Sequence, residues 1–398
     1  MSSPSAVRHI NETRALDAIR SQGSLSRADI ARELKVTRAT ASVLVASLIE
    51  VGMLVDESDA ASAARTTKRT GRPSTNVCLN PNYAYFLGVE VGVGRGTVAI
   101  IDFAGEVHAM HEYRFSLEQN EPKEVAERVA NEVRAVLATL DRRPKTISGR
   151  ISIAGLIDLK GHLVRSPFLG WYDIPFLEMM RSALPEVELM GVENDADAFA
   201  AAEMQYSVDR ENENTVYLLL DTGIGGCAVV DGNILRGHMG FAGELGHMII
   251  GDKGYSTSGN SVIDGSLESY VGRIALLKRY SHYGGHTEYI SEFVAALDGG
   301  EEAATSALHD WANHLGRGTA SIVSVLAPEH IVVGGALAPL YERCDAVVQA
   351  TLASKLVAGS HFPEFSISNL GRTAPAIGAA FLVQRDLFTY DPKIVFGK

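Results

Sequence analysis

The sequence predicts an α/β protein in which a small helix-turn-helix domain precedes a larger body built from two similar halves. Two short helical segments joined by a tight turn lie within the first 52 residues. A strand, a glycine-rich turn and a second strand then occur twice, at 84–102 and again at 216–230. The chain has 398 residues, which is too long for one compact core, so we expect more than one domain.

The first domain, which we expect to span residues 1–82, begins with an amphipathic helix that ends at a glycine. Ser26 and Asp29 then have the spacing of a capping box, in which each side chain bonds the backbone N–H of the other residue. Thr37 can cap a third helix, whose buried face includes Ala41 and Leu44. Helices in this order, joined by tight turns, are typical of a helix-turn-helix domain.

The start of the third helix is small and polar, which suits a helix that lies in the major groove of DNA. An arginine such as Arg38 can donate two hydrogen bonds to guanine, and hydroxyl side chains suit phosphates or a thymine methyl. The residues expected to contact DNA here are Thr37, Arg38, Ala39, Thr40 and Ser42. The alternative is a three-helix bundle whose polar face is only solvated.

A wing is predicted after the third helix, because strands at 53–55 and 77–79 enclose a polar loop rich in basic residues. Its tip carries Arg69 and Arg72, which we expect to enter the minor groove or neutralise phosphates. The alternative is a linker between domains.

Charge is distributed unevenly along the chain. Residues 1–80 contain 11 basic and 8 acidic residues, a net charge of +3, so the total of −12 leaves −15 for the remainder. A weakly basic head on an acidic body fits a DNA-binding domain joined to a sensor. No apolar run could span a membrane and no signal segment starts the chain, so we expect a cytoplasmic protein. Three widely separated cysteines predict neither a disulfide framework nor a metal-binding pair.

The body is predicted to alternate strands and helices in two halves. Its first half, residues 83–195, should contain strands at 84–91, 97–102, just after 105, 146–154 and 187–192, with a helix at 121–140. Its second half, residues 196–373, should contain strands at 216–220, 227–230 and 330–333, with helices at 196–206, 301–326 and 336–355. A C-terminal helix within residues 374–398 is expected to return to the first half.

Four motifs follow one another in the body. Glu193-Asn194-Asp195 ends a strand, a glycine turn follows at 221–226, and then come Gly243-Glu244-Leu245-Gly246-His247 and Glu268. In this order they resemble the sugar site of the ROK family, named for repressors, open reading frames and kinases. The resemblance covers about residues 10–385 and implies a duplicated actin-like body, of the sugar-kinase and ribonuclease H-like kind, with a sugar cleft between its two lobes.

The resemblance also implies which side chains bind the sugar. Convergent amide, carboxylate and imidazole groups can satisfy sugar hydroxyls, and a wrong sugar would leave them unpaired. The matching residues are Gly155, Asn194, Asp195, Glu244, His247 and Glu268. In family kinases the carboxylate that matches Asp195 is the catalytic base, although capping of the following helix is a second role open to it. Glucose, N-acetylated hexosamines and xylose-like sugars all suit this set, and Trp171 would either stack on the sugar or pack beneath the rim.

Two departures from the family pattern affect what this site can do. Glu90 replaces the aspartate of the first phosphate turn of family kinases, that turn is lengthened, and Cys227 replaces a glycine beside the second. We therefore expect a kinase-like sensor body that has lost phosphoryl transfer. Serines replace the zinc-binding cysteines of many relatives, so we expect no metal and no cofactor. These serines are Ser256, Ser258 and Ser266.

Together these features predict a sugar-responsive transcriptional regulator, most directly a repressor of genes for sugar uptake or catabolism. A sugar or sugar phosphate would release it from double-stranded operator DNA by favouring the state that binds DNA poorly. A homodimer or higher oligomer would read a palindrome. Two alternatives stay open, an active ATP-dependent sugar kinase and a repressor controlled by a protein partner, and the sequence does not separate repression from activation.

Overall fold

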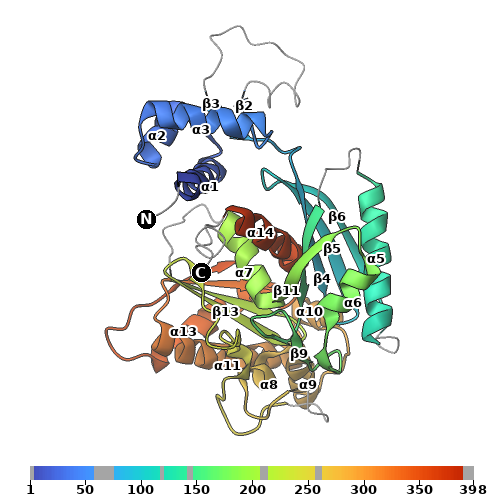
Figure 1. Ribbon diagram of the computed structural model, residues 1–398. Helices are drawn as coiled ribbons and strands as arrows, with labels where there is room; N and C mark the ends of the chain where they lie inside the picture. Colours follow the sequence, from blue (N-terminus) through green and yellow to red (C-terminus); the bar gives the residue numbers. More distant parts are fainter. Residues whose placement is uncertain are drawn as a thin grey trace.

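The computed structural model describes residues 4–57, 76–116, 121–140, 147–206, 214–255 and 262–388. A small N-terminal domain lies beside two α/β lobes, each built around a five-stranded sheet (Figure 1). This is the α/β architecture that the sequence predicted.

The N-terminal domain is a winged helix. Its helices are α1 (Pro4–Gln22), α2 (Arg27–Glu33) and α3 (Arg38–Glu50), and its strands are β1 (Ser24–Ser26), β2 (Leu54–Asp56) and β3 (Asn76–Leu79), paired in the order β1-β3-β2. Ser26 and Asp29 form the predicted capping box, and the Thr37 side chain accepts a hydrogen bond from the backbone of Thr40 at the start of α3. The wing strands β2 and β3 pair as predicted, while the tip with Arg69 and Arg72 lies outside the described residues.

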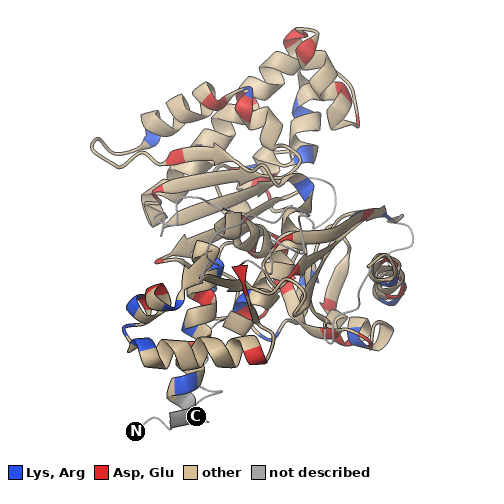
Figure 2. Cartoon of the chain, turned by 90° about the horizontal axis from the view of Figure 1, so that it is seen from above, with Lys and Arg blue, Asp and Glu red and all other residues tan. Residues whose placement is uncertain are grey.

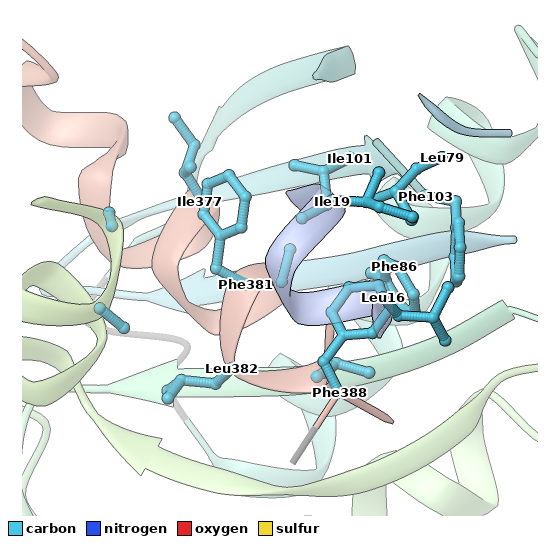
Figure 3. Close-up of a cluster of buried hydrophobic side chains, with 14 of the residues drawn as sticks. Leu16, Ile19, Leu79, Phe86, Ile101, Phe103, Ile377, Phe381, Leu382 and Phe388 are labelled. Carbon is cyan, nitrogen blue, oxygen red and sulfur yellow. The ribbon is translucent and has the colours of Figure 1, made fainter. Parts of the chain in front are cut away.

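The core of the winged helix is continuous with the core of the body. Leu16 and Ile19 of α1 belong to the same buried apolar cluster as Phe381 and Phe388 of the C-terminal helix (Figure 3). Burial of apolar area of this kind is the main favourable term in association between domains. The winged helix is therefore docked on the body by its first helix.

The first lobe holds a sheet in the order β11-β7-β4-β5-β6. These strands are β4 (Tyr85–Val91), β5 (Arg95–Asp102), β6 (Val107–Arg114), β7 (Ile147–Ile153) and β11 (Glu188–Asn194). Helices α5 (Pro122–Ala138) and α6 (Phe176–Ala183) cover one face through a second apolar cluster. A small sheet of β8 (Leu156–Ile157), β9 (Leu163–Ser166) and β10 (Trp171–Ile174) extends this lobe.

The second lobe holds a sheet in the order β14-β13-β12-β15-β16. These strands are β12 (Thr215–Leu220), β13 (Ile224–Val230), β14 (Asn233–Ile234), β15 (His330–Gly334) and β16 (Glu364–Ile367). Its helices are α8 (Leu267–Val271), α9 (Arg273–His282), α10 (Ile290–Asp298), α11 (Glu302–Leu326), α12 (Ala338–Glu342) and α13 (Asp345–Lys355). The prediction of a single helix at 336–355 was wrong, because the helix is interrupted at Arg343 and Cys344, which separate α12 from α13.

The two sheets have the same topology. In the first, β11, β7 and β4 are parallel and β5 and β6 continue as antiparallel hairpins. In the second, β16, β15 and β12 are parallel and β13 and β14 continue in the same way. The predicted duplication is therefore present in the strand order, and the equivalent hairpins β4–β5 and β12–β13 both approach the cleft.

Helices α7 (Asp195–Tyr206) and α14 (Ala374–Phe388) pack side by side between the two sheets (Figure 1). Gly378 of α14 makes this possible, since a Cβ there would stand 1.6 Å from the carbonyl oxygen of Ala198. The predicted return of the C-terminal helix to the first lobe is seen in the packing of α14 on β4, where a Cβ at Gly88 would meet the Ala376 carbonyl oxygen at 1.8 Å.

Acidic and basic residues are interspersed along the described chain rather than separated by sign (Figure 2). The net charge of +3 of residues 1–80, from 11 basic and 8 acidic residues, comes entirely from residues 58–75, which contain 4 basic residues and 1 acidic residue. Among the described residues, no helix is long and apolar enough to cross a membrane.

Candidate functional site

A cavity of about 280 Å³ lies between the two lobes. Its lining comes from the β4–β5 and β12–β13 hairpins, the loop after β7, the starts of α7 and α14, and the segments around Glu244 and Glu268. The structure brings all the predicted sugar contacts to this one cavity, namely Gly155, Asn194, Asp195, Glu244, His247 and Glu268.

Asn194 shapes the cavity wall. Its side-chain oxygen accepts hydrogen bonds from the backbone of Ala196 and Asp197, which caps α7, and its amide nitrogen donates to the Gly155 carbonyl at 2.9 Å. Because both polar atoms already have protein partners, Asn194 fixes the end of β11 against the loop after β7. Its neighbour Glu193 faces away from the cavity and forms ion pairs with Arg150 and Arg236.

Asp195 is the first residue of α7, and one of its oxygens accepts a hydrogen bond from the backbone of Ala196 at 3.0 Å. Burial, together with the nearby carboxylate of Asp221, raises the pKa of this carboxyl to about 6, against the hydrogen bonds at the helix start. Asp195 therefore combines the capping role with a position on the cavity wall. A carboxyl with a pKa near neutrality can accept or donate a proton at a sugar hydroxyl.

Glu268 presents one unpartnered oxygen to the cavity. Its Oε1 accepts a hydrogen bond from the backbone of Ile224 at 3.0 Å, while its buried Oε2 has no partner in the protein. Gly223 leaves room for this arrangement, since a Cβ there would lie 2.2 Å from Oε1. Burial raises the pKa of Glu268 to about 7. A buried polar atom without a partner is costly unless a ligand completes it.

His247 presents a second unpartnered atom. Its Nδ1 is buried without a hydrogen bond, and its Nε2 lies 3.5 Å from the Glu244 carboxylate. Burial lowers the pKa of His247, with a further contribution from Arg165, while burial raises the pKa of Glu244 to about 7. The second glycine of this motif, Gly246, is required by packing, because a Cβ there would lie 2.1 Å from the carbonyl oxygen of Ile224 on β13.

The sequence analysis did not predict a cluster of charged side chains that lies where the two hairpins meet. Arg95 contacts both oxygens of Glu90, at 3.2 and 3.3 Å, and Asp221 at 3.1 Å. Thr97 also donates a hydrogen bond to Glu90 at 3.1 Å. Burial raises the pKa of Glu90 to about 7, and the Arg95 charge opposes this rise. The spacing within 90–97 offered no signal for this cluster, because Asp221 comes from the other lobe.

The aromatic residue at the cavity is Phe168, whereas Trp171 is buried. Trp171 is 3% exposed and packs on Phe176 with the ring centroids 5.2 Å apart. Of the two roles considered for Trp171, packing is therefore correct and stacking on a sugar is wrong. Phe168 lines the cavity beside Glu268 and offers the apolar surface there.

Two other substituted positions have structural roles. The Cys227 thiol is buried in the second lobe against Asp197, and Cys227 is not among the described residues that line the cavity. Ser266 caps α8 by accepting a hydrogen bond from the backbone of Ser269. Ser256 and Ser258 lie outside the described residues. No group of three His, Cys, Asp or Glu residues among those described is arranged to hold a metal ion.

A second cavity of about 290 Å³ lies where α7 and α14 meet α1. Its residues include Arg20, Glu203, Gln205 and Arg385. Of the described buried side-chain atoms that lack a hydrogen-bond partner, none belongs to this second cavity, whereas Glu268 and His247 contribute such atoms to the first. The cavity between the lobes is therefore the better candidate for a polar ligand.

The start of α3 presents the predicted DNA-contacting residues to solvent. All five are exposed, namely Thr37, Arg38, Ala39, Thr40 and Ser42. Thr37 is also the helix cap, and its hydroxyl lies 2.9 Å from that of Thr40. Sequence reasoning missed Val43, which is 69% exposed on the same helix and is apolar, as a contact to a thymine methyl requires.

Comparison with known proteins gives matches over both parts of the chain. The ROK family model matches residues 86–386 and the MarR family model matches residues 9–63. The chain is 25% identical to the xylose repressor of Bacillus subtilis (strain 168), over 95% of each chain. It is 28% identical to the glucokinase of Halalkalibacterium halodurans, over 76% of this chain and 95% of the kinase.

Solved structures share the fold. A ROK family transcriptional regulator, described as a homologue of the E. coli MLC protein, superposes with a TM-score of 0.78 at 22% identity, over 96% of this chain and 97% of its own. A ROK family glucokinase from Streptomyces griseus, in complex with glucose and AMPPNP, superposes with a TM-score of 0.62 at 21% identity, over 75% of this chain and 98% of its own.

Proposed function

The chain belongs to the ROK family, and from this premise we propose that it is a transcriptional repressor that a sugar releases from operator DNA. The match to a xylose repressor supports this function, because it covers 95% of this chain and so includes the winged helix, whereas the glucokinase match covers 76%. The observation that carries the proposal is the pair of unpartnered buried atoms, Glu268 Oε2 and His247 Nδ1, in a cavity of a DNA-binding protein.

The sensor and the DNA-binding domain are joined by two helices. Helices α7 and α14 both begin at the cavity, where Asp195 and Pro375 line it, and both end beneath α1. A ligand that changes the angle between the lobes would move these helices as a pair, because Gly378 packs without clearance on α7. To act as an inducer, the sugar must bind more tightly to the arrangement that fits DNA poorly.

The effector is proposed to contact Asp195, Glu244, His247 and Glu268, with Asn194 and Gly155 holding the wall. Arg38 and its neighbours on α3 would lie in the major groove, and a homodimer would place two such helices on a palindrome in the cytoplasm. We propose that the site works without zinc. In support of this, Ser266 serves as a helix cap and a serine hydroxyl is a poor zinc ligand.

The test combines operator binding with ligand binding. Fluorescence anisotropy with operator DNA should show release by one member of a panel of neutral sugars, and the same sugar should raise the melting temperature. In Asp195→Asn, DNA binding should persist while both sugar effects disappear. Release of DNA by the sugar from that variant would place the effector elsewhere.

A second candidate function is residual sugar kinase activity, which the position of Asp195 on the cavity wall favours. A coupled assay with ATP, magnesium and the same sugars separates the two functions. Turnover by the native protein that is lost in Asp195→Asn would support kinase activity. No turnover by the native protein would exclude it and support the repressor function only.

A further inference from the structure

Arg95 lies among carboxylates at the end of the cavity where the two hairpins meet. Its guanidinium bonds both oxygens of Glu90 and one oxygen of Asp221, and Asp195 is near enough to interact with it electrostatically. Glu90 is only 3% exposed. A guanidinium bonded to two carboxylates in a poorly solvated place has its positive charge neutralised and most of its donors occupied.

This cluster also joins the two lobes. Arg95 and Glu90 belong to the β4–β5 hairpin of the first lobe, whereas Asp221 follows β12 in the second. The Arg95–Asp221 ion pair therefore crosses the cleft directly beside Asp195. A ligand group that extends beyond Asp195 toward the hairpins would meet this cluster.

We propose that the cavity takes an uncharged sugar rather than a sugar phosphate, and that Arg95, held between Glu90 and Asp221, is the residue that determines this choice. The inference rests on the proposed sugar-sensing function. A phosphate needs cationic or N–H donors that are free to pair with it, and the nearest cation is already paired with two carboxylates.

The other charges of the cavity support the same conclusion. Five carboxyl groups line it, namely Glu90, Asp195, Asp221, Glu244 and Glu268, against three arginines, Arg95, Arg165 and Arg372. Above pH 7, where Glu90, Glu244 and Glu268 are mostly ionised, a phosphate dianion brought into the cavity would be repelled, and repulsion is strong where solvent is scarce. Carboxyl groups whose pKa is near neutrality suit sugar hydroxyls, since they both donate and accept hydrogen bonds.

The remaining arginines do not provide an equivalent phosphate site. The Arg165 guanidinium lies over the Tyr172 ring, 5.3 Å from its centroid, and lowers the pKa of His247. Arg372 is exposed in the short turn Gly371–Thr373 just before α14, where solvent weakens its interactions. Arg372 therefore serves as the control, because it is a cavity-lining cation that takes no part in the Arg95 cluster.

The test is calorimetric titration of the full-length protein at about pH 8, above the pKa of about 7 of Glu90, Glu244 and Glu268. The ligands are matched pairs, namely glucose and glucose 6-phosphate, xylose and xylose 5-phosphate, and N-acetylglucosamine and its 6-phosphate. The native protein should bind the neutral member of the effective pair at least about tenfold more tightly. Asp221→Asn frees part of the Arg95 charge, so it should reduce this preference severalfold by improving phosphate binding. Glu90→Gln should act in the same direction and serves as the second variant should Asp221→Asn fold poorly. Arg372→Ala should leave the preference unchanged.

Three results would overturn the inference. These are tighter binding of a sugar phosphate by the native protein, a preference that both Asp221→Asn and Glu90→Gln leave unchanged, and a preference that depends on Arg372. Binding of neither member of any pair would instead contradict the proposed sugar-sensing function, and the inference would fall with it.

Discussion

Arg20 of α1 donates a hydrogen bond to the side-chain oxygen of Gln205, one residue before the end of α7. The other end of the same helix begins with Asp195 in the cavity. A single helix of 12 residues thus joins a carboxyl on the cavity wall to the first helix of the DNA-binding domain. Because α14 packs along it and also reaches α1, a movement of this pair would be transmitted to the DNA-binding domain.

Removal of this hydrogen bond should weaken the coupling between sugar and DNA. In Gln205→Ala we expect unchanged affinity for operator and for sugar separately, but a sugar-induced change in operator affinity that is smaller by about fivefold, since one such bond contributes about 1 kcal/mol. Gln205→Glu keeps an acceptor for Arg20 and should retain the coupling. Operator binding measured by anisotropy at several sugar concentrations checks both variants, and equal coupling in all three proteins would exclude this contact as part of the path.

The unpartnered oxygen of Glu268 predicts a specific effect on sugar binding. Glu268→Gln places an amide nitrogen or a fixed acceptor where a titrating carboxyl stood, so sugar affinity should fall on the order of tenfold or more. Operator affinity should not change, because Glu268 lies between the lobes and far along the chain from α3. Calorimetry for sugar and anisotropy for DNA provide the two measurements, with Glu127→Gln on the exposed face of α5 as the control.

The part of this architecture that sequence could predict was carried by local signals. The Ser26–Asp29 capping box, the Thr37 cap and the strand–turn–strand repeats depend on neighbouring residues, and the structure has all of them. The helix expected at 336–355 failed because apolar spacing continues through Arg343 and Cys344, although the backbone turns there.

Long-range contacts explain what sequence could not provide. The pairing of Arg95 with Asp221 joins residues 126 positions apart, and the burial of Trp171 depends on α6, so neither has a local pattern. The motifs predicted which side chains meet in one cavity. They did not predict that the Asn194 side chain bonds the backbone, or that Glu268 Oε2 and His247 Nδ1 are buried without a hydrogen-bond partner. These hydrogen bonds depend on the backbone that lies beside each side chain.

The exposed face of α3 predicts distinct effects on DNA binding. Arg38→Ala should weaken operator binding on the order of tenfold and relax selectivity at one base pair, provided that Arg38 contacts guanine. Val43→Ala should cost less and reduce discrimination for thymine at one position. Arg32→Ala serves as the control, because Arg32 pairs with Asp29 on α2. Thermal melting and sugar binding should be the same in all four proteins, and normal operator affinity in both α3 variants would move the DNA contact elsewhere.

Close packing of α7 on α14 predicts that alanine substitutions at two glycines change the free energy of unfolding by very different amounts. Gly378→Ala places a Cβ 1.6 Å from the Ala198 carbonyl oxygen, so the helices must separate and the free energy of unfolding should fall by at least about 3 kcal/mol. Gly299→Ala, with its nearest atom at 3.4 Å, should change it by less than about 1 kcal/mol. Urea denaturation measures both variants. A Gly378→Ala variant that unfolds like the native protein would show that this helix pair has slack, which would weaken the case for its movement as a unit.

Burial of Glu90 predicts that its contribution to stability depends on pH. Its pKa rises from 4.5 to about 7 on folding, so between these values the folded protein holds a proton that the unfolded chain has lost. The contribution of Glu90 to the free energy of unfolding therefore falls by up to about 3 kcal/mol as pH rises from 4.5 to 7. Outside this interval its contribution does not change with pH. Glu90→Gln lacks this titration, so its stability relative to the native protein should increase over the same interval. Urea denaturation at half-unit steps from pH 4.5 to 7.5 measures the difference, with Glu127→Gln expected to show none. A relative stability of Glu90→Gln that falls as pH rises would mean that Arg95 holds Glu90 ionised, with its pKa below that of a free glutamate, and that the ion pair outweighs the cost of burial.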